Sequence, residues 1–88
     1  MRIGLLASGN LGFIILEYMT PLYQIEFVMT DKKSDTIIDF CLNNNIHCFA
    51  GNPRSGKAHS FITNKSVDLI ISVNYLFIIE KDIIELPT

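Results

Sequence analysis

The sequence has little of what several specialised classes of protein depend on. Its 88 residues include two cysteines and no tryptophan, too few cysteines for a small domain held by disulfides. The seven Lys and Arg residues are scattered and the net charge is -2, which argues against a nucleic-acid surface built on a dense basic patch. No apolar run approaches the roughly 18 residues that span a bilayer, and residues 1–12 do not have the form of a signal peptide. These absences predict a cytoplasmic protein without a membrane partner.

The chain does have abundant material for a core. Hydrophobic residues make up 49% of it, which excludes disorder. Its length suits one small domain and not two. A chain this short buries only roughly 60 to 65% of its unfolded surface, so its core is marginal unless something completes it.

Short apolar runs alternate with segments of helical periodicity. Strands are expected at 2–7, 24–30, 46–50 and 67–73, and helices at 11–19, after Ser34 as far as Asn43, at 56–64 and at 80–85. This β-α-β-α-β-α-β-α order predicts an α/β fold, a Rossmann-like parallel sheet covered on both faces. Apolar residues at positions 11, 14, 15, 18 and 19 mark the expected buried stripe of the first helix, and those at 37, 38, 41 and 42 mark that of the second. Four strands are few for an open α/β sheet, so we expect an incomplete domain whose last strand lacks a neighbour.

Ligands of such sheets bind at the carboxyl ends of the strands. Ser8-Gly9-Asn10-Leu11-Gly12 follows the first strand and opens a helix, a place where backbone N–H groups favour an anion. The alternative is a tight turn without a ligand. Asp31 ends the second strand, 22 positions after Gly9, about where a dinucleotide-binding acid holds a ribose hydroxyl. Its alternative is a solvated carboxylate at the start of a loop.

Residues 51–58 nearly match the phosphate loop G-x-x-x-x-G-K-[ST]. Ala58 lacks the hydroxyl that would hold magnesium, the segment follows the third strand and not the first, and no later strand ends in an acid. An NTPase is therefore not expected. Arg54 and Lys57 remain candidate contacts for an anionic substrate, with a solvated loop as the alternative.

Other clusters of polar residues favour structural roles. The spacing of Cys41, His47, Cys48 and His59 fits no zinc pattern, so the cysteines are expected to be small buried hydrophobes and the histidines free surface groups. The carboxylates of the helices are expected to be solvated; they are Glu17, Asp39, Glu80, Asp82 and Glu85.

The segment Asn74-Tyr75-Leu76-Phe77-Ile78-Ile79 is unusual, because an apolar run continues past the end of a strand. It either packs into the core or forms the wall of a pocket for a flat ring, with main-chain groups holding the edge of the ring.

Two blocks carry a resemblance to a known family: residues 1–10, and residues 68–79 together with 83–87. The strand, the apolar loop and the short helix ending in Leu86-Pro87 occur in the order seen in the formyltransferases that use 10-formyltetrahydrofolate. The chain resembles the N-terminal part of their Rossmann-like domain over residues 1–88. The resemblance implies formyl transfer to an amine, with this folate as the donor. It implies a folate site at Leu76, Phe77, Ile78 and Ile79, and a substrate site at Ser8, Gly9, Asn10 and Arg54.

The resemblance also implies that this chain has no catalytic residues. The family's Asn-x-His stands on the next strand and its Asp further on, beyond the position of Thr88, and His47 and His59 are in the wrong places to substitute. We therefore expect the 88 residues to supply the folate- and substrate-binding half and to be inactive alone. The acceptor, a sugar amine, an aminoacyl-tRNA or a ribotide, stays open, although a tRNA would need basic surface that this chain lacks.

Two other hypotheses remain. The chain is either a small flavodoxin-like module that binds an anion or nucleotide, or a truncated or degenerate gene product that binds no ligand. An unpaired last strand could also join copies into an oligomer.

Overall fold

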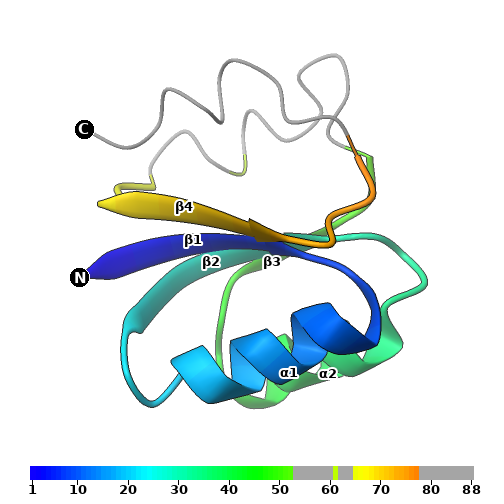
Figure 1. The fold of residues 1–88 in the computed structure, drawn as a ribbon, viewed down its shortest axis with the longest axis horizontal. Helices are drawn as coiled ribbons and strands as arrows, with labels where there is room; N and C mark the ends of the chain where they lie inside the picture. Colours follow the sequence, from blue (N-terminus) through cyan, green and yellow to red (C-terminus); the bar gives the residue numbers. More distant parts are fainter. Residues whose placement is uncertain (53–60, 62–64, 78–88) are drawn as a thin grey trace.

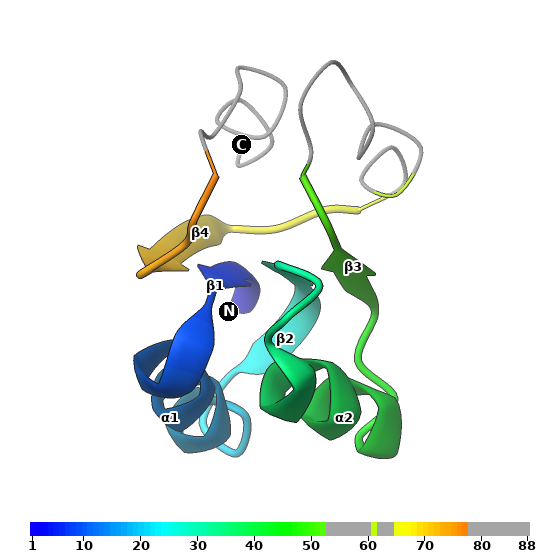
Figure 2. The same ribbon diagram turned by 90° about the vertical axis from the view of Figure 1, so that its right-hand side faces the viewer.

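The computed structural model describes residues 1–52, 61 and 65–77. They form a four-stranded, wholly parallel sheet with the strand order β3-β2-β1-β4. Two helices lie on one face of this sheet (Figures 1 and 2). The elements are β1 (Arg2–Ala7), α1 (Gly9–Met19), β2 (Gln24–Thr30), α2 (Asp35–Asn43), β3 (Cys48–Ala50) and β4 (Leu69–Val73).

The predicted α/β class and parallel sheet are confirmed, and the helices predicted at 11–19 and after Ser34 are present as α1 and α2. The sheet grows from β1 through β2 to β3, and then continues on the other side of β1 with β4. This reversal next to β1 is the kind of switch point at which open α/β sheets bind ligands. The third and fourth strands are each two residues shorter than predicted. The helices expected at 56–64 and 80–85 lie outside the described residues, except for Phe61.

The stripe predicted for α1 is partly right, because Met19 is buried and Ile15 packs against the core. Gly12, Leu16 and Met19 face the sheet, while Leu11, Ile14 and Tyr18 are exposed. Gly12 is the reason: a Cβ there would lie 2.9 Å from the Cβ of Ala7, so the bare backbone lets the helix approach β1 closely. The stripe predicted for α2 is partly right. Ile37 and Cys41 are buried, whereas Leu42 is 75% exposed.

The sheet separates two apolar clusters. One lies under the helices and includes Leu5, Leu16 and Ile37, and the other lies on the opposite face and includes Leu6, Phe27 and Val67. Strand residues alternate between these faces, but β2 breaks the alternation. Ile3 is paired with Ile25 and Gly4 with Phe27, so Glu26 is the extra residue of a bulge. The bulge turns the Phe27 ring to the face opposite the helices.

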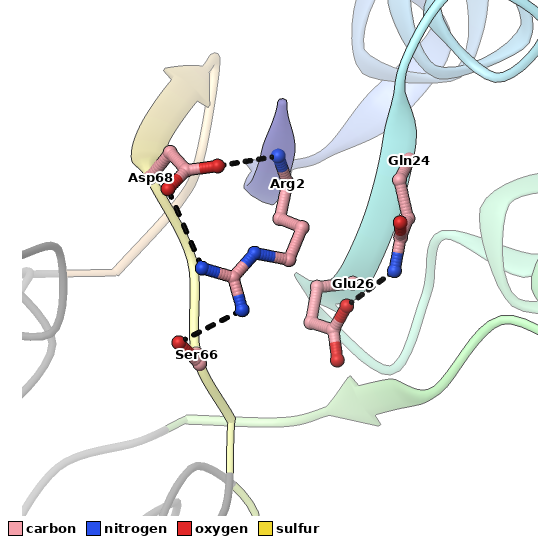
Figure 3. Close-up of polar contacts among 5 residues, drawn as sticks. All are labelled: Arg2, Gln24, Glu26, Ser66 and Asp68. Carbon is pink, nitrogen blue, oxygen red and sulfur yellow. Dashed lines mark hydrogen bonds and ion pairs between the residues drawn. The ribbon is translucent and has the colours of Figure 1, made fainter.

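The amino-terminal edge of the sheet is joined by polar contacts (Figure 3). The Arg2 backbone N–H donates to Asp68 Oδ2 at 2.9 Å, and the Asp68 N–H donates to the Arg2 carbonyl at 2.8 Å. The Arg2 guanidinium also bonds to Ser66 Oγ at 3.0 Å and reaches Asp68 Oδ1 at 3.4 Å. Because these groups are exposed, the ion pair adds little stability. The contacts instead set the register with which the chain enters β4.

Candidate functional site

A pocket of about 410 Å³ opens at the carboxyl edge of the sheet. Among the described residues, three segments form it: one after β2, one after β3 and one after β4. It is lined by Asp31, Lys32, Lys33, Gly51, Asn52, Leu76 and Phe77. The position is where parallel α/β sheets bind ligands, and the lining combines an apolar wall with two lysines.

The residues after β4 divide between the core and this pocket. Tyr75 packs against the cluster of Leu6, Phe27 and Val67, and its ring meets that of Phe77 edge to face at 5.6 Å. Leu76 is 67% exposed and lies on the wall of the pocket. The core alternative therefore holds for Tyr75, while Leu76 and Phe77 border a hollow. Ile78 and Ile79 lie outside the described residues.

The turn after β1 lies at the switch point but does not line the pocket. Gly9 has a φ of 70°, a left-handed conformation that glycine adopts without strain. The place of a Cβ on Gly9 is 3.7 Å from Asn74 Nδ2, so the turn meets the end of β4. Ser8 is buried and Asn10 is exposed. The Gly9 N–H donates to Ser34 Oγ at 3.0 Å and is thus already used within the protein.

Asp31 holds the two loops of this edge together. Its Oδ1 accepts the Ser34 hydroxyl at 2.6 Å and its Oδ2 accepts the Lys33 N–H at 2.9 Å. The Ser34 hydroxyl oxygen in turn accepts the Gly9 N–H, so a chain of hydrogen bonds joins the loop after β2 to the start of α1. Burial raises the pKa of Asp31, but the Ser34 hydroxyl, the nearby Ser8 hydroxyl and the Lys33 N–H together outweigh it and hold this pKa below its ordinary value. Asp31 is therefore a charged structural anchor that is only 6% exposed. This burial contradicts the expected solvated carboxylate, while the ribose contact stays a prediction.

The Asp31 network has a further effect on Tyr75. Burial, and then the negative charge of Asp31, raise the pKa of Tyr75 to about 12. The Tyr75 hydroxyl has no hydrogen-bond partner among the described residues, and the same holds for the buried hydroxyls of Ser8 and Thr30. Sequence analysis named Ser8 and the segment that contains Tyr75 but not Thr30, and it did not connect the three hydroxyls, because nothing in the spacing shows that these strand ends lie together.

Several candidates lie elsewhere. Arg54 and Lys57 are outside the described residues. His47 directly precedes β3, at the amino-terminal edge opposite the pocket, and its Nδ1 contacts Lys65 Nζ at 2.8 Å.

No group of three or more His, Cys, Asp or Glu side chains suited to a metal occurs in the part of the chain that the structure describes. No helix within those residues is long and apolar enough to cross a membrane. Neither the protein-family models nor the curated proteins contain a match to this chain. The fold and the pocket are thus the observations on which a functional proposal rests.

Proposed function

We propose that this chain is the folate- and substrate-binding half of a formyltransferase-like domain, with 10-formyltetrahydrofolate bound beside Leu76 and Phe77. One observation carries the proposal: an apolar segment after β4 borders a pocket at the carboxyl edge of a parallel sheet and is not sealed in the core. An exposed leucine beside a half-buried aromatic ring offers a flat surface on which a heterocyclic ring loses water.

The charge of the pocket supports the same ligand. Lys32 and Lys33 lie in its lining together with Leu76 and Phe77. A reduced folate has a flat ring at one end and carboxylates at the other. An apolar wall with cations nearby therefore complements both ends, and the lysines would attract the carboxylates while the ring lies against Leu76.

Catalysis is assigned to groups other than those of the pocket. Asp31 lines it, but both of its oxygens accept hydrogen bonds and its pKa is lowered, which makes the carboxylate a weak base. In the proposed reaction a neutral amine attacks the formyl carbon, and an Asn-x-His pair with an Asp, as in the family, stabilises the oxyanion and moves the protons. The 88 residues alone are expected to bind the donor without transferring its formyl group.

The rival proposal, a module that binds a dinucleotide, has less support. The Gly9 N–H and the Asp31 carboxylate are the groups that such a ligand would use. Both are engaged with Ser34.

We expect Leu76→Glu to weaken the binding of tetrahydrofolate at least tenfold. A charged side chain would remove the apolar contact that the bound ring makes with Leu76. Fully covering a leucine side chain that is otherwise exposed to water is worth about 1.5–3 kcal/mol. Leu42→Glu is the matched control, since Leu42 is 75% exposed on α2 and does not line the pocket. Binding to the 88-residue chain is measured by calorimetry and by amide chemical shifts.

The expected shifts cluster at residues 76–77 and spare the turn after β1. Equal affinity of the two glutamate variants would contradict the folate site. A titration with NAD completes the experiment, because shifts at Ser8–Gly12 and Asp31 with NAD, and none with the folate, would establish the rival instead.

A further inference from the structure

Two cysteines from different elements meet beside α2. Cys41 is fully buried on the inner face of this helix, and Cys48, the first residue of β3, packs against the same cluster. Both side chains belong to the same apolar cluster, and each thiol shifts the pKa of the other. The turn between them brings them together, because the Ile46 N–H donates to the Cys41 carbonyl at 2.9 Å and β3 starts two residues later.

We propose that Cys41 and Cys48 form a reversible intramolecular disulfide when the chain meets an oxidised low-molecular-weight disulfide such as oxidised glutathione. The Cys48 thiolate attacks one sulfur of the small disulfide, and a mixed disulfide forms while the first small thiolate leaves and takes up a proton. Cys41 then loses its proton and attacks Cys48 Sγ, which releases the second small thiolate. Two protein thiols are oxidised to one disulfide and one small disulfide is reduced to two thiols.

The environments of the two thiols give this order of events. Cys48 is half-buried, whereas Cys41 has no exposed surface, so an external disulfide reaches Cys48 first. The hydrogen bond from Cys41 lowers the pKa of Cys48 more than burial raises it. The interaction with Cys48 and burial raise the pKa of Cys41. Cys48 is thus the accessible nucleophile and Cys41 the buried resolving thiol.

The short connection favours closure within one chain over linkage between chains. Only residues 42–47 separate the two cysteines, so the effective concentration of Cys41 beside a mixed disulfide at Cys48 is high. A disulfide requires Cβ atoms about 3.5–4.5 Å apart. Residues 43–45, which join α2 to β3, are exposed, so we place the final approach of the two side chains in this connection.

The experiment treats the native chain with mixtures of oxidised and reduced glutathione and measures intact mass. The expected product has lost two hydrogen atoms, carries no glutathione and returns to the starting mass with dithiothreitol. Trypsin leaves both cysteines on one peptide, because no Lys or Arg lies between them, and the mass of that peptide locates the bridge. A product that keeps glutathione, a linked dimer, or a chain that stays reduced natively but reacts in urea would each overturn the proposal.

Two variants separate the roles of the cysteines. Cys41→Ser is expected to accumulate glutathione on Cys48, since no resolving thiol remains. Cys48→Ser is expected to react at least tenfold more slowly than Cys41→Ser, because its remaining thiol is buried. Circular dichroism verifies that each variant is folded, and the wild-type mass experiment decides the question if either is not. Rapid modification of folded Cys48→Ser would contradict the assigned order.

Discussion

Gly4→Ala is expected to lower the free energy of unfolding by about 1–3 kcal/mol, the range seen when extra atoms are forced into a packed core. A Cβ on Gly4 would lie 2.4 Å from Cζ of Phe27 and 2.7 Å from its Cε2. The ring cannot easily move aside, because it is fully buried and meets Phe61 edge to face at 5.9 Å. Urea unfolding followed by circular dichroism measures the loss.

A smaller side chain at position 27 provides the control for the clash between a Cβ on Gly4 and the Phe27 ring. Phe27→Leu removes the ring atoms nearest to Gly4 and is itself destabilising because it empties part of the core. In that background Gly4→Ala should cost clearly less than in the wild type, and the double-mutant cycle gives the difference. Equal costs in the two backgrounds would show that the Phe27 ring does not set the requirement for glycine.

Asp31→Asn is expected to lower the free energy of unfolding by about 1–3 kcal/mol, because it replaces a buried carboxylate that accepts hydrogen bonds. Asp31 accepts one hydrogen bond at each oxygen. An asparagine keeps one acceptor and turns an amide N–H₂ group toward the other donor, Ser34 or Lys33. The strain then reaches Gly9 through Ser34, so chemical shifts should change at the start of α1 as well as in the loop after β2. Asp39→Asn, on the exposed side of α2, is the control and should change stability little.

The same carboxylate gives the stability of the chain a defined acid dependence. Its pKa is lower in the folded state than the ordinary value of 3.8. The stabilisation is therefore fully present above the unfolded pKa and disappears as the pH falls through the lower pKa of the folded state. Asp31→Asn should therefore flatten the dependence of the unfolding free energy on pH in that acid range, compared with the wild type. An unchanged slope in Asp31→Asn would show that Asp31 does not contribute it.

The strands and the two described helices were predictable because their periodicities are local. The apolar runs at β1 and β2 were placed with their observed bounds, and Ser34 was placed directly before α2. The use made of Ser34 was not predictable. Its hydroxyl does not cap α2 but joins Asp31 to Gly9. No local sequence pattern predicts that these two residues lie close together in space.

The burial of α1 shows why a periodic pattern can mislead. Its sequence is apolar on several sides, so Leu11, Ile14 and Tyr18 satisfied the helical spacing equally well. Gly12 decided the orientation, because the helix packs most closely where it has no side chain. The bulge at Glu26 belongs to the same class of feature, since it arises from the pairing of β2 with β1 and not from β2 alone.

The alternation of apolar runs with helical segments was enough to establish a parallel α/β sheet, and with it the edge at which a ligand would bind, because both follow from short-range periodicity and chain handedness. Only the tertiary structure decided which residues meet at that edge. It combined Leu76 with Lys32 and Gly51 in one pocket and engaged Asp31 in an internal network. The physical reason is that strand order and register bring together pocket residues up to 46 positions apart in the chain, from Asp31 to Phe77, and no local pattern encodes such contacts.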